Sequence, residues 1–487
     1  MIKIEPSVLI YIDKNDLLVR QKHIDDFDDF IQFGFGNSFI KLKKFTYPKI
    51  FFEEHLQKFI GGYSLGEDNF SFEVSEQKLI LKTPLLGELQ LFYYQSKNLF
   101  FAADSFSALV KILKDKNVVL QIDENGLVDL LTLNFDLVTR TFFKGIKKLK
   151  ENSVLSFSKE LTISQKAKLE DQVKPFILVN KNKSDSTFEK YFLEQIKKIS
   201  LIYDKEKWGS CLSGGTDSAI STYFANLTKP TVGVAAIVND SNQERQLTVI
   251  KKISTFLGIN TFTIKASETD LFSDLNNYLL RDPYLDPYGN WSVAFAYELL
   301  AQNIDLVFTG LGADDYFSVA SNSSRKTAPI KGSINEYFTY KIPKKVSPKM
   351  TSLLNSSLSD ASCFYYSPWR NVGIWPVSPF INQDLISLSL YLNDTDKKNK
   401  IFLKSFFAKQ VNQSFSEWQK KISLKTSLKL SLLANLDKDI NISNYLNNSS
   451  SIKIDLIKSR FNAHSINDDE LDFFFMFIRL NKFLLSI

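Results

Sequence analysis

The most constraining feature of the chain is residues 207–220, which read Lys-Trp-Gly-Ser-Cys-Leu-Ser-Gly-Gly-Thr-Asp-Ser-Ala-Ile. Small and apolar residues lead into a hydroxyl, two glycines, an acid and a second hydroxyl, and a helix-like segment follows at once. This order predicts a strand, a tight turn and a helix N-terminus. Glycines let main-chain N–H groups approach an anion, and the helix start adds further N–H donors. An ordinary helix-capping turn is the alternative, but the combination of residues favours an anion site.

The acid in this stretch predicts a metal ion. A carboxylate at Asp217 would repel a bound phosphate unless it held Mg²⁺. No Gly-Lys-Ser/Thr follows the glycines, so the stretch is not a Walker A loop. A second turn, residues 309–317 (Thr-Gly-Leu-Gly-Ala-Asp-Asp-Tyr-Phe), also follows an apolar run. We expect Asp314 in this turn to face Asp217, so that two carboxylates share one Mg²⁺.

Hydrophobic patterning predicts an α/β fold with two parts. The first part, up to about residue 105, has recurring strand patterns, and two helices follow at 105–114 and 123–133. After the 207–220 stretch, strand patterns alternate with helical patterns, which predicts a doubly wound parallel sheet with its ligand at the carboxyl ends of the strands. The expected strands are 232–238, 261–265 and 305–309, and the expected helices are 244–257 and 291–301. Residues 360–487 look helical, and we expect the last helix to close this second domain.

Composition excludes several classes. Among the 487 residues 44% are hydrophobic, which is typical of a globular protein with large cores. The net charge of +6 is mild at this length; it suits an anionic ligand and predicts no nucleic-acid partner. Two cysteines exclude a disulfide scaffold. We find no signal-like start and no apolar stretch long enough to span a membrane, so we expect a cytoplasmic protein.

Residues 213–218, Ser-Gly-Gly-Thr-Asp-Ser, resemble the PP-loop signature of ATP pyrophosphatases. Together with residues 310–317 they resemble the asparagine synthetase superfamily, although Asp315 and Tyr316 replace the family's Glu and Leu. Weaker similarities lie at 101–104, 141–149, 282–287 and 371–382. The resemblance implies a degenerate glutaminase-like α+β sandwich at 1–160, a linker at 161–186 and an ATP-dependent synthetase domain at 187–487.

The resemblance also implies site residues, with ATP and Mg²⁺ as cofactors. Asp217 and Asp314 would hold the metal. The nucleotide would be bound by residues from both turns and the second strand: Leu212, Ser213, Gly214, Gly215, Thr216, Asp217, Ser218, Val234, Gly310 and Gly312. Lys404, Lys420 and Lys421 are candidates for phosphate or oxyanion stabilisation, with solvated lysines as the alternative. Tyr316 is a candidate near the acceptor, with a buried structural tyrosine as the alternative.

Two departures from the family direct the functional expectation. Glutaminase domains of the family use an N-terminal cysteine nucleophile, whereas position 2 is Ile2 and Cys211 is the first cysteine, so we expect no glutamine hydrolysis. Aligning the Pro379-Phe380 segment puts Trp375 where the family has a glutamate of the amide-forming step. An indole cannot accept a proton there. We therefore expect an apolar acceptor site and an amine delivered as part of a bulky substrate.

Relatives without the cysteine include β-lactam synthetases and lasso-peptide macrolactam cyclases. The stretches 418–421 and 475–483 resemble the latter weakly. The expected function is an ATP-dependent amide ligase acting on a carboxylate-bearing substrate, with a precursor peptide as the leading candidate. A leader-peptide-binding or protease partner protein would accompany it. Asparagine synthesis from aspartate and ammonia, a small-molecule cyclase and a non-catalytic binding paralogue remain alternatives.

Overall fold

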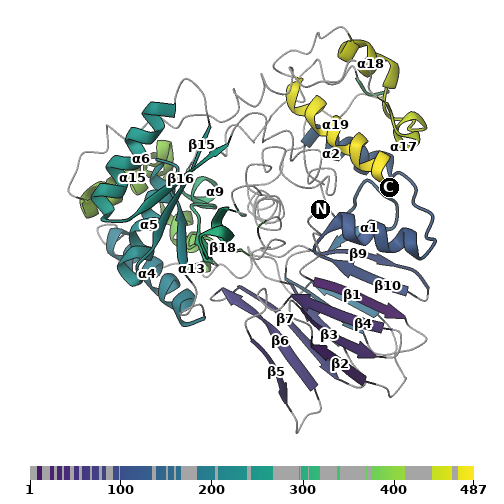
Figure 1. The fold of residues 1–487 in the computed structure, drawn as a ribbon, viewed down its shortest axis with the longest axis horizontal. Helices are drawn as coiled ribbons and strands as arrows, with labels where there is room; N and C mark the ends of the chain where they lie inside the picture. Colours follow the sequence, from purple (N-terminus) through teal and green to yellow (C-terminus); the bar gives the residue numbers. More distant parts are fainter. Residues whose placement is uncertain are drawn as a thin grey trace.

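The computed structural model describes the following residues: 8–13, 22–26, 30–35, 38–43, 49–53, 58–65, 68–75, 79–83, 91–97, 99–133, 139–149, 152–157, 161–165, 184–202, 207–238, 243–266, 296, 298–304, 306–318, 337–339, 369, 374–411, 441–462 and 470–487. They form two antiparallel sheets and one parallel sheet with helices around them (Figure 1). The mixed α/β fold expected from the sequence is confirmed.

The N-terminal part is built from two antiparallel sheets. The seven-stranded sheet has the order β11-β9-β10-β1-β4-β3-β2, and the six-stranded sheet has the order β13-β12-β8-β7-β6-β5. Strands of the first sheet are β1 (Val8–Asp13), β2 (Lys22–Asp26), β3 (Phe30–Phe35), β4 (Ser38–Lys43), β9 (Leu91–Gln95), β10 (Leu99–Ala103) and β11 (Ile146–Leu149). Strands of the second are β5 (Lys49–Glu53), β6 (Lys58–Leu65), β7 (Asp68–Ser75), β8 (Leu79–Lys82), β12 (Ser153–Phe157) and β13 (Leu161–Gln165).

Alternation along β9 and β10 explains why these strands have two buried faces. Leu91 and Phe100 belong to the core shared with Phe72 and Leu81 of the second sheet. Phe92 and Phe101 point the other way, into a core with the helices α1 (Phe106–Asp115) and α2 (Glu124–Leu133). Successive side chains of a strand face opposite sides, so a run that is apolar at every position must be covered on both. Here the second sheet covers one face and the helices cover the other.

The parallel sheet has the strand order β16-β15-β14-β17-β18, and every neighbouring pair is parallel. Its strands are β14 (Trp208–Cys211), β15 (Val232–Val238), β16 (Thr261–Ala266), β17 (Leu306–Phe308) and β18 (Trp375–Val377). From β14 at the centre the chain moves outward through β15 and β16, then returns to the other side of β14 as β17. The order therefore reverses between β14 and β17, and ligands of such sheets bind at this switch point, beyond the carboxyl ends of the strands.

Helices enclose the parallel sheet. On one face lie α4 (Ser184–Ile202), α5 (Thr216–Thr228), α6 (Gln243–Leu257), α13 (Gln383–Tyr391) and α15 (Ile401–Val411), whose side chains share one core with the sheet. The ring of Phe188 lies at the centre of an aromatic cluster that joins α4 to Phe317, Phe380 and Phe406. Ala296 and Leu299 cover the opposite face with Val234 and Val307. Packing on both faces fixes the positions at which the strands end.

The C-terminal elements lie on the N-terminal part, contrary to our expectation that they close the second domain. These elements are α17 (Asn444–Asn447), α18 (Ile454–Asn462) and α19 (Leu471–Ser486), and they share a core with α1 and α2 (Figure 1). Tyr337 donates a 2.7 Å hydrogen bond to the fully buried Glu470, and Phe338 forms a β-bridge with Ile452. Among the described residues, 337–339, 441–462 and 470–487 therefore pack on the N-terminal part, whereas Trp369 and residues 374–411 pack around the parallel sheet.

Other sequence expectations are met in part. β18 is a strand within the stretch 360–487 that was expected to be helical. β13 lies at the start of the expected linker, 161–186, and residues 166–183 of that linker are outside the described residues. Of the helix expected at 291–301, residues 296 and 298–301 are described and helical. The domain boundaries themselves remain predictions. Within the described ranges, no helix combines the length and apolar character needed to cross a bilayer.

Candidate functional site

The first turn leads from β14 into α5. Leu212 is buried, and its N–H donates a 2.7 Å hydrogen bond to the carbonyl of Val234, which holds the loop against β15. Gly214 has φ +79°, a left-handed conformation that glycine adopts without steric cost. Gly215 is the N-cap of α5 and has no side chain with which to cap the helix. The first-turn N–H groups of α5 therefore suit an anion, as expected from the sequence.

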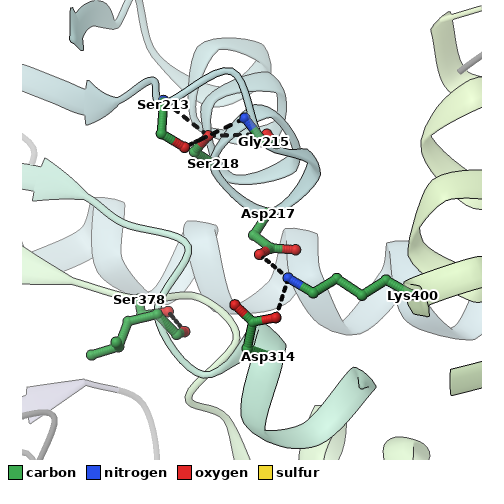
Figure 2. Close-up of polar contacts among 8 residues, drawn as sticks. Ser213, Gly215, Asp217, Ser218, Asp314, Ser378 and Lys400 are labelled. Carbon is green, nitrogen blue, oxygen red and sulfur yellow. Dashed lines mark hydrogen bonds and ion pairs between the residues drawn. The ribbon is translucent and has the colours of Figure 1, made fainter. Parts of the chain in front are cut away.

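Two serines close this loop (Figure 2). The hydroxyl of Ser218 accepts from the N–H of Ser213 at 3.2 Å and donates to the carbonyl of Gly215 at 3.0 Å. The two serine hydroxyls lie 3.1 Å apart, and the N–H of Gly215 donates to the Ser213 hydroxyl at 3.4 Å. Ser213 is exposed, whereas Ser218 is buried and Thr216 is buried beside it in the first turn of α5. The network gives the loop a fixed shape with one hydroxyl at its open side.

The second turn leads from β17 into the short helix α9 (Ala313–Phe317). Gly310 lies so close to α5 that a Cβ atom there would come within 2.8 Å of both the Asp217 Cβ and the Ser218 nitrogen. Gly312 has φ +86°, and Ser221 of α5 donates a 2.9 Å hydrogen bond to the carbonyl of Thr309. The two glycines and this bond bring the second turn directly against the first, at the switch point of the sheet.

Asp217 and Asp314 meet on one ammonium group. The Nζ atom of Lys400 lies 2.5 Å from Asp314 Oδ1 and forms a second ion pair with Asp217 Oδ2 (Figure 2). The side chains of Lys400 and Asp217 are 16% and 18% exposed, whereas that of Asp314 is 49% exposed. Burial by itself lowers the pKa of Lys400, but the charges and hydrogen bonds of the two carboxylates outweigh burial and raise the pKa above its ordinary value. Lys400 is therefore cationic at neutral pH.

Lys400 comes from the turn before α15. It ends a short 3₁₀ segment, η7 (Lys398–Lys400), which follows α14 (Asp394–Lys397). Asn399 and Lys400 have φ values of 53° and 58°, both left-handed. Lys400 is hard to recognise from the sequence, because in Asp-Lys-Lys-Asn-Lys it resembles part of a solvated charge run. The asparagine, which favours left-handed turns, was the only local signal.

The geometry fits a divalent cation held by two acids. The ammonium marks a position from which one cation reaches an oxygen of each carboxylate. Mg²⁺ is commonly bound through one or two carboxylates, with phosphate and water oxygens completing its octahedron. Among the described residues there is no cluster of three or more His, Cys, Asp or Glu side chains. The described residues thus offer a two-carboxylate site, and oxygens from a ligand would complete its coordination.

Three other residues selected from the sequence are buried. Val234 is buried in the core beneath the sheet, and Tyr316 is 3% exposed in the core around α9. Trp375 is also 3% exposed and starts β18, opposite Leu306, at the end of the strand away from the switch point. Its indole is part of the core, which removes the basis for expecting it to line the acceptor site.

The selected lysines divide into two groups. Lys404 is half-buried on α15, one turn beyond Lys400, and within the described ranges the two carboxylates are bridged by Lys400 and not by Lys404. Lys420 and Lys421 lie outside the described residues, as does the 282–287 loop.

Burial raises the pKa of the Cys211 thiol, just before the first turn, to about 12, so it is no thiolate nucleophile at neutral pH.

Comparison with protein families finds a similarity that includes both turns. The asparagine synthase family model matches residues 199–361. This range is an asparagine synthase domain of the PP-loop ATP pyrophosphatase type and includes both turns, with Asp217 and Asp314. The match supports an ATP-using enzyme at the level of the family. Lys400 lies beyond the matched range, so its part in the site comes from the structure alone.

Solved structures give distant similarities. An NMN synthetase from Francisella tularensis has 14% identity and a TM-score of 0.23, covering 51% of this chain and 92% of that one. A U34-tRNA thiolase, NcsA, from Methanococcus maripaludis with its [4Fe-4S] cluster has 14% identity and a TM-score of 0.24, covering 53% and 83%. Similarity at this level supports no functional argument. No curated protein matches the chain.

Proposed function

We propose that this chain, which contains an asparagine synthase domain at residues 199–361, is an ATP-dependent ligase that forms amide bonds. The substrate carboxylate attacks the α-phosphorus of ATP, pyrophosphate leaves, and an amine then attacks the acyl-adenylate and releases AMP. The observation that supports this most is the position of the two turns. They lie against each other at the switch point of the parallel sheet, and each contributes one carboxylate, Asp217 and Asp314, to the same ammonium group.

The residues of the two turns have distinct roles in this proposal. The N–H groups of residues 213–218 and the hydroxyls of Ser213 and Ser218 bind the pyrophosphate oxygens. Asp217 and Asp314 would hold Mg²⁺, which supplies positive charge beside the leaving group. Gly310 allows the two turns to lie in contact, so that the carboxylates of Asp217 and Asp314 can bind the same cation. Lys400 forms an ion pair with each of the two carboxylates in the structure.

For the second step we propose an amine within the same peptide, giving a macrolactam. The segment that resembles the family's glutamate stretch, residues 371–382, contains no acidic side chain that could act as a base. Loss of a general base typically costs ~10²–10⁴-fold in rate. Holding amine and adenylate in one molecule contributes up to ~7–11 kcal/mol in well-oriented cases. An intramolecular acceptor therefore compensates for the missing base, whereas free ammonia does not.

ATP–pyrophosphate exchange tests the first step. The wild-type protein should incorporate labelled pyrophosphate into ATP only when a suitable carboxylate is present. Asp217→Asn should reduce exchange by at least 10²-fold, since a first-turn carboxylate beside the phosphates is lost. Asp185→Asn is the matched control, because Asp185 is ion-paired with Lys409 instead. Exchange by the Asp217→Asn variant near the wild-type level at saturating Mg²⁺ would contradict the proposal.

Product mass tests the second step. Incubation with ATP, Mg²⁺ and a candidate precursor peptide should give a product lighter by one water. Aspartate with ammonium should give little asparagine under the same conditions. Efficient asparagine formation would instead identify an ammonia-using synthase and would reject the macrolactam proposal while retaining adenylation.

A further inference from the structure

The ion pairs of Lys400 place a cation where the two carboxylates converge. Asp217 comes from the first turn of α5 and Asp314 from α9, so the two acids belong to different turns of the site. Two carboxylates that contact the same atom are close enough to repel each other unless a cation lies between them. In the structure that cation is the Lys400 ammonium, whose side chain extends between the two acids (Figure 2).

The backbone holds Lys400 in place at a conformational cost. Asn399 and Lys400 are consecutive left-handed residues, and lysine rarely adopts this conformation. Such residues persist where the surrounding structure fixes them, and they are frequent at functional sites. The surroundings here are firm, because Phe402 and Phe406 of the adjoining α15 pack against the ring of Phe188. Lys400 is thus directed at the acid pair and is not a freely moving surface lysine.

A divalent cation bound by the same oxygens would need the space of this ammonium. Mg²⁺ binds carboxylate oxygens at 2.0–2.1 Å. The Lys400 Nζ is already 2.5 Å from Asp314 Oδ1 and contacts Asp217 Oδ2. Two cations cannot lie there together, both for lack of room and because like charges repel. Binding of one at these two oxygens therefore excludes the other.

We propose that Lys400 is an internal counter-cation that holds the Asp217–Asp314 pair until a divalent cation replaces its ammonium group. The inference rests on the proposed function only in taking the acid pair as a divalent-cation site. The lysine keeps the two acids converged in the absence of nucleotide. It also weakens metal binding in that state, since the metal must first displace it.

Manganese binding without nucleotide tests this exchange. Free Mn²⁺ is followed by its electron paramagnetic resonance signal during titration with protein. Lys400→Met should bind Mn²⁺ at least ~10-fold more tightly than wild type, because the ammonium that competes for the two oxygens is removed. Lys409→Met is the matched control, since it removes one positive charge from the same helix region but its partner is Asp185. The double variant Lys400→Met/Asp314→Asn should not show this increase in Mn²⁺ affinity, because one of the two carboxylates is removed. Equal affinity of Lys400→Met and wild type would overturn the proposal.

A measurement on the wild-type protein covers the case in which Lys400→Met does not fold. Lysine acetylation is mapped by mass spectrometry with and without Mg²⁺. Labelling of Lys400 should rise several-fold with Mg²⁺ as its ammonium leaves the acids, whereas labelling of Lys409 should not change. Unchanged labelling of Lys400 at saturating Mg²⁺ would overturn the inference. Neither readout needs ATP turnover, so loss of the proposed ligase activity and loss of cation exchange are distinguishable.

Discussion

At the scale of single residues, Gly310 determines how closely the two turns of the site approach. Its backbone lies against Asp217 and Ser218, so that even one methyl group would be too close to atoms of α5 that cannot move aside easily. The contact is with the Asp217 Cβ and the Ser218 backbone nitrogen. A side chain at 310 must therefore separate Asp314 from Asp217.

We expect Gly310→Ala to reduce ATP–pyrophosphate exchange by at least ~10²-fold, since misplacement of about 1 Å has effects of this size. Overpacking should also lower the free energy of unfolding by about 1–3 kcal/mol. Gly258→Asn is the control, because Gly258 has φ +63° and nothing within 4 Å of a Cβ, and asparagine tolerates this conformation. Kinetic assay and urea unfolding give both quantities. Wild-type exchange by Gly310→Ala would show that the turns need not touch.

Lys400 shows what sequence reasoning misses at this scale. The two glycine-bearing turns carry their own signal, since glycines, hydroxyls and acids follow apolar runs at both. Lys400 carries little signal beyond the asparagine before it, because its role depends on a left-handed turn and on a helix packed by distant aromatic residues. Trp375 illustrates the reverse error. A motif alignment selected it for the site, but its position in the strand places it in the core.

At the scale of elements, Glu124 links α2 to the loop before α18. Ser449 donates a 2.6 Å hydrogen bond to its carboxylate, and the Ser451 hydroxyl and the Ser450 N–H also donate to it. Burial tends to raise the pKa of Glu124, but these hydrogen bonds outweigh burial and lower the pKa below its ordinary value of 4.5. These hydrogen bonds join elements that are far apart in sequence, so their loss should destabilise both α2 and the loop before α18.

A lowered folded-state pKa means that the stabilisation by Glu124 is present above the unfolded-state pKa and is lost as pH falls through the folded-state pKa. We expect Glu124→Gln to be less stable than wild type at neutral pH. Its stability should also fall less on acidification through the range below pH 4.5. Urea unfolding across this range measures the effect, with Glu244→Gln, exposed on α6, as control. A parallel acid response of variant and wild type would contradict the assignment.

Most strands and helices around the site were predictable, because their apolar residues recur at the period of the element they form. β15 spans 232–238 as predicted, and α6 ends before Gly258 as predicted. β18 was missed because three residues with a central proline give no period. Its place at the sheet edge depends on pairing with β17, which only the assembled fold supplies.

At the scale of the whole molecule, α19 completes a core that begins with α1 and α2. Phe483 is 1% exposed. The centroid of its ring lies 6.0 Å from the ring centroid of Phe106 and 6.1 Å from that of Phe142. Apolar residues fill nearly every turn of α19, which is typical of a helix covered on several sides. The sequence indicated a core helix correctly but could not indicate to which part of the molecule that core belongs.

We expect Phe483→Ala to destabilise the N-terminal part by about 3–5 kcal/mol, the usual cost of removing a buried phenylalanine ring. Hydrogen exchange should accelerate in α1 and α2 and stay near wild type in β14 and α5, which share a different core. Leu485→Ala, on the same helix but 47% exposed, should change stability by less than ~0.5 kcal/mol. Acceleration confined to β14 and α5 would contradict the shared core.

The placement of α19 has a consequence for biosynthesis. During translation α1 and α2 leave the ribosome early, but the helix that covers them follows only after the whole parallel sheet has been made. Domains usually fold as units while the chain emerges, N-terminal segments first. Here the N-terminal part must wait with an apolar face uncovered, while the α/β part can complete its parallel sheet. Pairings this distant in sequence form slowly. The apolar face of the N-terminal part is therefore exposed to aggregation until α19 has been released.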